Sequence, residues 1–178
     1  MRRKLNTVHL VVVLIILAAA FYIANNNPFI GIMKQKISIT LPDMAFRYSE
    51  GYFYDYLYRL EASGREAYLQ FYCFIDFIFP VVYSVLGYLL FTFFLQRIKP
   101  CFLHKLAFVA FLFGLLDITE NILNIILIKA YPDTLSLFSR LSSWLTTLKI
   151  IIGAIFILLL LYAVIIVSLS KIKKSSRL

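Results

Sequence analysis

The sequence predicts an all-α integral membrane protein: a bundle of four transmembrane helices with a short extracytoplasmic interfacial helix. Three observations favour this fold class. First, 62% of the 178 residues are hydrophobic and 15% are charged, with a mean hydropathy of +0.86, whereas soluble domains have roughly 45–50% apolar and about 25% charged residues. Second, four apolar stretches are each long enough to cross a bilayer, which takes about 17–25 residues. Third, the basic residues gather beside these stretches, as in membrane topology signals.

The chain is expected to form a single membrane domain, residues 1–178. Its predicted spans cover residues 8–24, 68–94, 106–128 and 141–167. The first span is the shortest, and the basic residues before it together with "LAAAF" within it also fit a secretory signal peptide. Cleavage of this span therefore stays an alternative. The motif "NNNPF" that follows is a strong helix breaker and predicts a clean end to the first helix.

The long loop, residues 25–67, is expected to carry the interfacial helix. "TLPD" is typical of a helix start, with Thr40 as a candidate cap. "EGYFYDYLYRLEASG" is rich in tyrosine, a residue that favours the headgroup level of a bilayer. The pattern predicts a short helix that ends at Gly64, followed by a second span capped by Ser63 and Glu66. Such a helix is either a lid over the bundle or a gating or binding element.

Charge asymmetry predicts the orientation. Ten basic and no acidic residues lie in three segments: the N-terminal segment, the loop between the second and third spans, and the C-terminal segment. The opposite side holds seven basic and six acidic residues. By the positive-inside rule both termini are cytoplasmic and residues 25–67 are extracytoplasmic. A bacterial plasma membrane is favoured over an organelle membrane.

The third span carries an unusual polar face. Asp117, Glu120, Asn121 and Asn124 stand at i, i+3, i+4 and i+7, one stripe of a helix that Gly114 extends. Each buried carboxylate costs about 2.5–3.5 kcal/mol on insertion, so the apolar residues of this span barely offset two of them. Other helices must therefore cover this face.

Two further spans have matching stripes. The second span offers Cys73, Asp76, Pro80, Tyr83 and Gly87, and the fourth offers Ser142, Thr146, Lys149 and Gly153. Counting 1.5 Å per helical residue places three charged side chains at one level in the outer half of the bilayer: Asp76, Glu120 and Lys149. Intramembrane ionisable groups usually pair or line a water-filled cavity. We therefore expect Lys149 to contact Glu120 or Asp76. Unless an arginine descends from the loop, for which Arg65 and Arg140 are the candidates, at least one of the three acids is expected to stay protonated.

These side chains form the candidate site. Coupled carboxylates suit acid–base chemistry, so Asp76, Asp117 and Glu120 are candidate acids or bases and Lys149 a candidate anion stabiliser. The candidate ligand-binding residues are Asn121, Asn124, Tyr83 and Arg65. No CxxC, phosphate-binding glycine loop or HExxH occurs; hence neither a cofactor nor a metal is predicted. Nucleic acid is not an expected partner either, because the basic residues lie beside the apolar stretches. The network could also serve only to fix helix packing.

Three functions remain open at the level of sequence. The first is a one-sided pocket for a lipid-like molecule or a small amine or cation, with or without acid–base catalysis; whether the chain is an enzyme is left open. The second is a subunit of an ion- or proton-coupled transporter or channel. The third is a structural or assembly protein. Expected partners are membrane lipids, and either further copies of this chain or a larger membrane complex. The apolar run "LAFVAFLFG" before Asp117 disfavours a polar path through the bundle.

Overall fold

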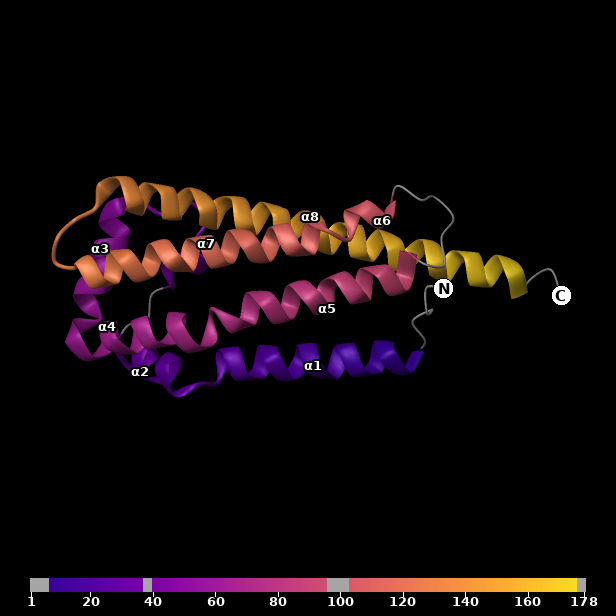
Figure 1. Cartoon of the computed structure of the whole chain (residues 1–178), viewed down its shortest axis with the longest axis horizontal. Helices are drawn as coiled ribbons and strands as arrows, with labels where there is room; N and C mark the ends of the chain where they lie inside the picture. Colours follow the sequence, from indigo (N-terminus) through magenta and orange to yellow (C-terminus); the bar gives the residue numbers. More distant parts are fainter. Residues whose placement is uncertain (1–6, 37–39, 96–102, 176–178) are drawn as a thin grey trace.

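The computed structural model describes residues 7–36, 40–95 and 103–175, and all regular elements within these ranges are helical. Figure 1 shows them in order of the sequence. The elements are α1 (Thr7–Asn25), α2 (Pro28–Lys36), η1 (Pro42–Met44), α3 (Glu50–Arg59), α4 (Glu61–Gln70), η2 (Phe71–Ile75), α5 (Ile78–Leu95), α6 (Leu103–Leu106), α7 (Val109–Ala130) and α8 (Ser136–Ser175). The short element η1 is a 3₁₀ turn, and η2 is a π-helix.

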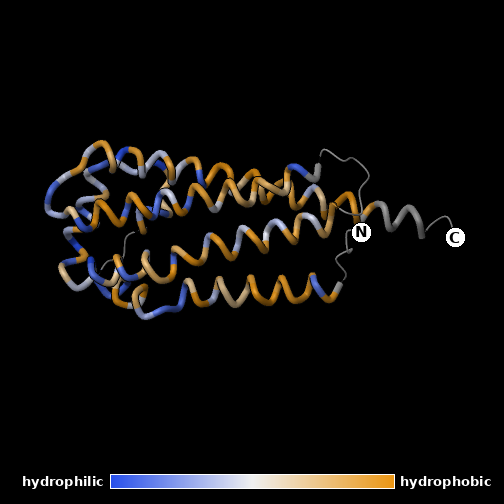
Figure 2. The backbone as a smooth tube through the Cα atoms, viewed as in Figure 1, coloured by the Kyte–Doolittle hydropathy of each residue, from blue (hydrophilic) through white to orange (hydrophobic). Residues whose placement is uncertain are grey.

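Four helical stretches are long and apolar enough to cross a membrane. They cover Val8–Asn25, Glu61–Leu95, Val109–Ala130 and Ser136–Val167. In Figure 1 they run side by side along the molecule, with α2, α3 and α4 gathered at one end and the start of α1 and the end of α8 at the other. Figure 2 shows that hydrophilic residues concentrate at the end that carries α2–α4, whereas the shafts are hydrophobic.

Helix α7 lies at the centre of the packing. It contacts α8 along one side and α5 along the other, whereas α1 packs along α5 and leaves most of its side chains exposed. At the end of the bundle, the faces of α2, α3 and α4 bury an aromatic cluster that includes Phe53, Tyr56, Tyr68 and Tyr72. This cluster holds the segment between α1 and α5 over the end of the helices and so positions η1.

The break between α3 and α4 differs from the expected one. The helix was expected to end at Gly64 with Ser63 as the next cap, but α3 ends at Arg59 and α4 begins at Glu61, whose φ is 57°. Leu60 is fully buried and anchors the turn in the aromatic cluster. Gly64 lies inside α4 against this leucine, where a Cβ would stand 3.0 Å from Leu60 Cδ2. Packing of the leucine therefore decides the position of the break.

The expected helix start at "TLPD" is a 3₁₀ turn, Pro42–Met44, with Leu41 and not Thr40 at the N-cap. The carbonyl of Thr40 instead accepts a 2.6 Å hydrogen bond from the Tyr52 hydroxyl. The longer helix α3 begins after Ser49, whose side chain accepts from the Tyr52 amide at 3.1 Å. Thr40 thus contributes through its main chain, and the helix cap lies further along the loop.

A π-turn interrupts the second long stretch just before the candidate site. The amide of Asp76 donates to the carbonyl of Phe71, five residues earlier, at 3.0 Å. A π-turn adds one residue to the turn and so rotates the preceding residues by about 100° relative to a regular α-helix. This explains why Cys73, expected on the same face as Asp76, is exposed while Asp76 is buried.

Candidate functional site

The polar face of α7 is buried in the middle of the bundle. Asp117 is 6% exposed, and Glu120, Asn121 and Asn124 are fully buried. Gly114 continues this face and allows α5 to approach closely. A Cβ at this position would collide with the Ser84 hydroxyl and lie 2.9 Å from the Pro80 carbonyl oxygen. Buried polar groups need hydrogen-bond partners, so the partners of this face must come from α5 and α8.

Lys149 on α8 supplies the central contact. Its Nζ lies 2.6 Å from Glu120 Oε2 and 2.8 Å from Asp117 Oδ1. The Thr146 hydroxyl donates to Glu120 Oε1 at 2.6 Å, and the Tyr83 hydroxyl donates to Asp117 Oδ2 at 2.7 Å. The expected contact between Lys149 and Glu120 is therefore present, and both carboxylates are held by a cation and a hydroxyl.

Asp76 was the alternative partner for Lys149, and no contact joins these two side chains in the described part of the chain. Its main-chain carbonyl accepts a 2.5 Å hydrogen bond from the Asn121 amide. Pro80, four residues further on, has no N–H to offer this carbonyl, as proline in a helix never does. Asn121 therefore repairs the helix at the proline, and the Asp76 carboxylate stays free of side-chain partners among the residues that the structure describes.

A second set of hydrogen bonds extends from the site toward the α3 end. Asn124 donates to the Tyr72 hydroxyl at 2.8 Å and accepts from Ser142 at 2.6 Å. The Tyr48 hydroxyl donates to Ser142 at 2.8 Å, and Tyr72 shares a 2.7 Å hydrogen bond with Tyr68. These bonds tie α7, α8, η2 and the segment before α3 together, so Asn124 acts here as a link between elements.

A cavity of about 980 Å³ opens beside the charged residues. Its lining is polar near one end and apolar elsewhere, and four long helices and η1 contribute to it. The lining residues are Leu14, Leu17, Ala18, Phe21, Asp43, Met44, Asp76, Phe79, Tyr83, Gly87, Leu90, Ala110, Phe113, Asp117, Lys149, Ile150, Phe156, Ile157 and Leu160. A volume of this size suits a drug-sized or lipid-sized molecule.

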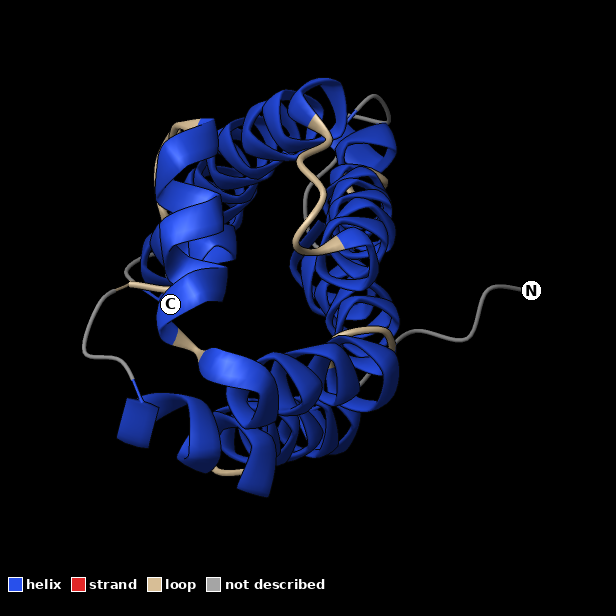
Figure 3. Ribbon diagram, turned by 90° about the vertical axis from the view of Figure 1, so that its left-hand side faces the viewer, coloured by secondary structure: helices blue, strands red, loops and turns tan. Residues whose placement is uncertain are grey.

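The cavity has an open side between α1 and α8. Helix α1 has no extended contact with α8 in the described part of the chain. Phe21 of α1 and Ile157 of α8 line the cavity and are nevertheless 64% and 57% exposed. Figure 3, a view along the bundle, shows the helices arranged around a central region. The opening therefore faces sideways, through the apolar flank of the molecule.

Asp43 is a site residue that sequence reasoning missed. It lies in η1, between α2 and α3, and lines the same cavity as Asp76 and Asp117. Its Oδ1 is fully buried and has no hydrogen-bond partner. Burial raises the pKa of the Asp43 carboxyl, the Lys149 charge lowers it, and Asp117 raises it; the net direction is upward. The one signal in the sequence is an acid within the otherwise apolar run "LPDMAF".

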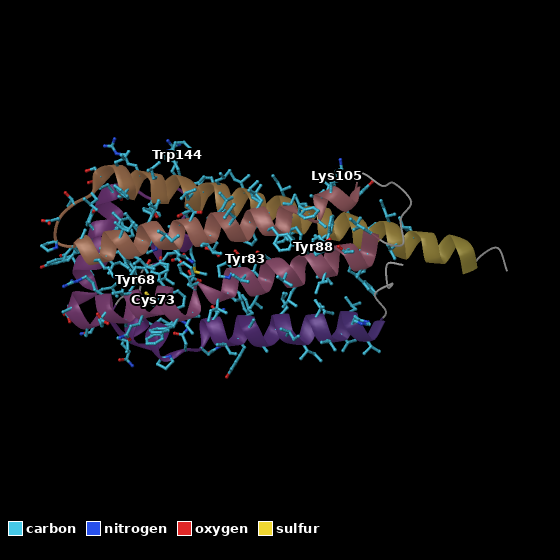
Figure 4. All side chains as sticks on the ribbon, viewed as in Figure 1. Tyr68, Cys73, Tyr83, Tyr88, Lys105 and Trp144 are labelled. Carbon is cyan, nitrogen blue, oxygen red and sulfur yellow. The ribbon has the colours of Figure 1, made fainter. Side chains whose placement is uncertain are left out.

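The structure brings together only part of the predicted site. Asp76, Asp117 and Lys149 line the cavity, together with Tyr83 from the predicted binding residues. Figure 4 places Tyr83 between Cys73 and Tyr88 along the second long helical stretch, well beyond Tyr68. The predicted candidates that do not line the cavity are Glu120, Asn121, Asn124 and Arg65. The first three lie next to its polar end. Glu120 contacts Lys149, Asn121 donates to the Asp76 carbonyl, and Asn124 bonds to Tyr72 and Ser142.

Neither of the two candidate arginines descends toward the acids. The Arg65 guanidinium donates to the Leu57 carbonyl at 2.9 Å and lies 4.4 Å from the centre of the Tyr131 ring. Arg140 is exposed and borders a separate depression with Trp144. Both therefore stay near the α3 end of the bundle, and Lys149 is the one basic residue in the cavity lining.

Within residues 7–36, 40–95 and 103–175, no group of three or more His, Cys, Asp or Glu side chains is arranged to hold a metal ion.

Comparisons with models of protein families, with curated proteins and with solved structures found no match to this chain. The chemistry of the cavity is therefore the basis on which a function can be inferred.

Proposed function

We propose that this chain is an integral membrane protein that binds the polar end of a lipid-like molecule in the cavity beside Asp76, Asp117 and Lys149. The apolar part of the molecule lies along α1 and α8. The observation that carries this proposal is the distribution of polarity in the 980 Å³ cavity, whose charged residues meet at one end while the remaining walls are apolar. Binding pockets commonly combine apolar walls with a few polar groups that fix orientation.

The position of the opening supports lateral entry. The exposed cavity residues Phe21 and Ile157 flank the side between α1 and α8, and in a bilayer this side faces lipid chains. A lipid-like molecule could therefore move into the cavity without leaving the apolar layer. The charge asymmetry of the sequence supports an orientation with the α2–α4 end outside the cell, and in that orientation the charged residues lie in the outer half of the bilayer.

A transport path is less well supported. Transport would require polar groups to continue from Asp117 toward the other end of the bundle. The cavity residues in that direction are Leu90, Ala110 and Leu160, which are all apolar. A pocket closed at that end fits these residues better than a channel.

Acid–base chemistry on the bound molecule is a second candidate, favoured by one observation. Asp43 Oδ1 has no hydrogen-bond partner, and the Asp76 carboxylate has none among the described side chains. Carboxylates of this kind are free to accept or donate a proton at a bound ligand. Incubation of the purified protein with its co-purified lipid would reveal a product by its mass, and Asp76→Asn should abolish that product.

A pair of matched variants on α1 tests the binding proposal. Ala18 and its neighbour Ala19 are both exposed, but Ala18 lines the cavity and Ala19 does not. Native mass spectrometry of the full chain in a mild detergent should detect a bound lipid-sized molecule. Ala18→Trp should reduce its occupancy strongly, because the indole fills cavity space, and Ala19→Trp should leave it unchanged. Equal occupancy in the two variants would contradict the proposal.

A further inference from the structure

Two carboxylates at the polar end of the cavity lack a partner. Asp76 is 8% exposed and lines the cavity, yet its carboxylate receives no hydrogen bond or ion pair from any side chain in the described ranges. Asp43, in η1, lines the same cavity, and its Oδ1 is buried without a hydrogen bond. A buried acceptor without a donor is costly, so both positions indicate a donor that a ligand would bring.

Lys149, the one basic side chain that lines the cavity, already contacts two other acids. Lys149 contacts Asp117 and Glu120, and each of these acids also accepts a hydroxyl hydrogen bond. Four acids therefore face one lysine in and directly behind the cavity. The two acids without a side-chain partner, Asp43 and Asp76, therefore have no counter-charge within the described protein, and a cation bound beside them would supply it.

The missing group must supply both positive charge and N–H or O–H donors, because a carboxylate is satisfied best by a charged donor. It must also belong to a molecule with an apolar part. A small inorganic cation would leave the apolar walls formed by Leu17, Phe113 and Ile157 without contacts. An amine at the end of an apolar chain meets both requirements, because the amine contacts the acids and the chain contacts the apolar walls.

Building on the proposed function, we propose that the ligand is an amphiphile with a protonated primary amine, whose N–H groups donate to the carboxylates of Asp43 and Asp76. The amine stands at the polar end of the cavity, and the chain runs toward α1 and α8. Two sources carry this chemistry: a free long-chain amine, or the ethanolamine headgroup of a phospholipid. In both, the ammonium brings the positive charge and the donors that the two acids lack.

Binding of three probes that share one chain separates charge from donors. Dodecylamine carries charge and N–H groups, dodecyltrimethylammonium carries charge alone, and dodecanol carries a donor without charge. Binding to the full chain in neutral detergent can be followed by native mass spectrometry and by the rise in melting temperature, since a ligand of the folded state stabilises it. Dodecylamine should bind at least about tenfold more tightly than either of the others.

Matched variants locate the contact. Asp43→Asn and Asp76→Asn should each remove the preference for dodecylamine, whereas Asp133→Asn, at an exposed acid on the α7–α8 connection, should retain it. The melting temperatures of the unliganded variants establish that each is folded. If the folded Asn variants keep the full preference, the amine does not contact these acids and the inference is wrong.

The source of the amine is tested in nanodiscs of phosphatidylethanolamine or phosphatidylcholine, two lipids that differ at the headgroup nitrogen. Retention of the ethanolamine lipid alone would identify a lipid headgroup, and binding of dodecylamine alone would identify a free amine; both support the inference. Equal binding of dodecylamine and dodecanol would overturn it and leave the lipid-binding proposal standing. If none of the probes binds and Ala18→Trp behaves like Ala19→Trp, the binding proposal itself fails.

Discussion

The side-chain amide of Asn121 donates a 2.5 Å hydrogen bond to the main-chain carbonyl of Asp76. In a continuous α-helix this carbonyl would accept from the amide of residue 80, but residue 80 is proline. Helix α7 thus completes the main-chain hydrogen bonding at the junction of η2 and α5, where the cavity acid Asp76 lies. The relationship fixes the height of Asp76 relative to Asp117 and Lys149.

This relationship predicts energetic coupling between Asn121 and Pro80. Asn121→Ala should destabilise the protein by about 1–3 kcal/mol, because it leaves a buried carbonyl without a donor. In a Pro80→Ala background the new amide can serve the carbonyl, so the same substitution should cost less. Equilibrium unfolding of the four proteins of the double-mutant cycle in detergent measures the difference. Strictly additive costs would mean that the proline does not create the need for Asn121.

The polar face of α7 could be predicted from sequence because it depends on helix periodicity alone. Asp117, Glu120, Asn121 and Asn124 all stand inside, as their spacing requires. The contact between Lys149 and Glu120 could be anticipated as well, since depth along a straight helix follows from a rise of 1.5 Å per residue. Periodicity and depth are local properties, and a sequence displays them directly.

The rest of the site depends on tertiary structure that no local pattern encodes. Asp43 reaches the cavity because an aromatic cluster folds the loop after α2 back over the bundle. Cys73 leaves the polar face because a π-turn changes the phase of the helix before Asp76. The cavity itself exists because α1 packs on α5 and not on α8. Helix spacing of this kind follows from the summed packing of many side chains, and hydropathy does not report it.

Lys149 should be the most sensitive single position in the bundle. Lys149→Met should destabilise the protein by about 3–5 kcal/mol, because Asp117 and Glu120 then remain as buried charges without a cation. The triple variant with Asp117→Asn and Glu120→Gln should recover a large part of this loss, since neutral side chains need no counter-charge. Thermal unfolding in detergent provides the comparison. A triple variant less stable than Lys149→Met would show that the charge pairing is not what stabilises this region.

Asp43 should make stability depend on pH. Burial holds its pKa in the folded protein above the ordinary value of 3.8, although Lys149 opposes the rise. The unfolded chain then releases the proton first, so the stability of the parent falls as the pH rises from about 3.8 through the folded pKa. Without an amine ligand, Asp43→Asn should therefore be more stable than the parent at neutral pH and gain nothing below pH 3.8.

Unfolding midpoints measured across this pH range, with Asp133→Asn as an exposed control, test the effect of Asp43. The control should show no growing advantage over the parent as the pH rises. An advantage of Asp43→Asn that is constant with pH would assign the effect to packing and not to charge.

The proposed orientation predicts where reporters work. Green fluorescent protein fused to either end of the chain should fluoresce, because the proposed orientation, which rests on the ten basic residues of that side, has both termini in the cytoplasm. Alkaline phosphatase joined after Asp133, on the α7–α8 connection, should be active, since this connection lies at the α2–α4 end. Activity of the phosphatase at the chain ends would reverse the orientation and move the charged site to the cytoplasmic half.

Gly114 should be the glycine that tolerates substitution least. A Cβ at this position would lie 2.9 Å from the Pro80 carbonyl oxygen and would collide with the Ser84 hydroxyl. Gly114→Ala should therefore push α7 away from α5 and cost about 1–3 kcal/mol. It should also weaken the hydrogen bond from Tyr83 to Asp117, which spans the same two helices.

Gly31 in α2 offers the matched control for Gly114, because a Cβ there meets nothing within 4 Å. Gly31→Ala should be neutral or stabilise the protein by about 0.4–1 kcal/mol, since alanine has less conformational freedom to lose in a helix. Melting temperatures of the two variants, measured in the same detergent, should move in opposite directions. A Gly114→Ala protein as stable as Gly31→Ala would mean that α5 and α7 can separate without cost, and that the spacing of Asp76 and Asp117 is not fixed by this contact.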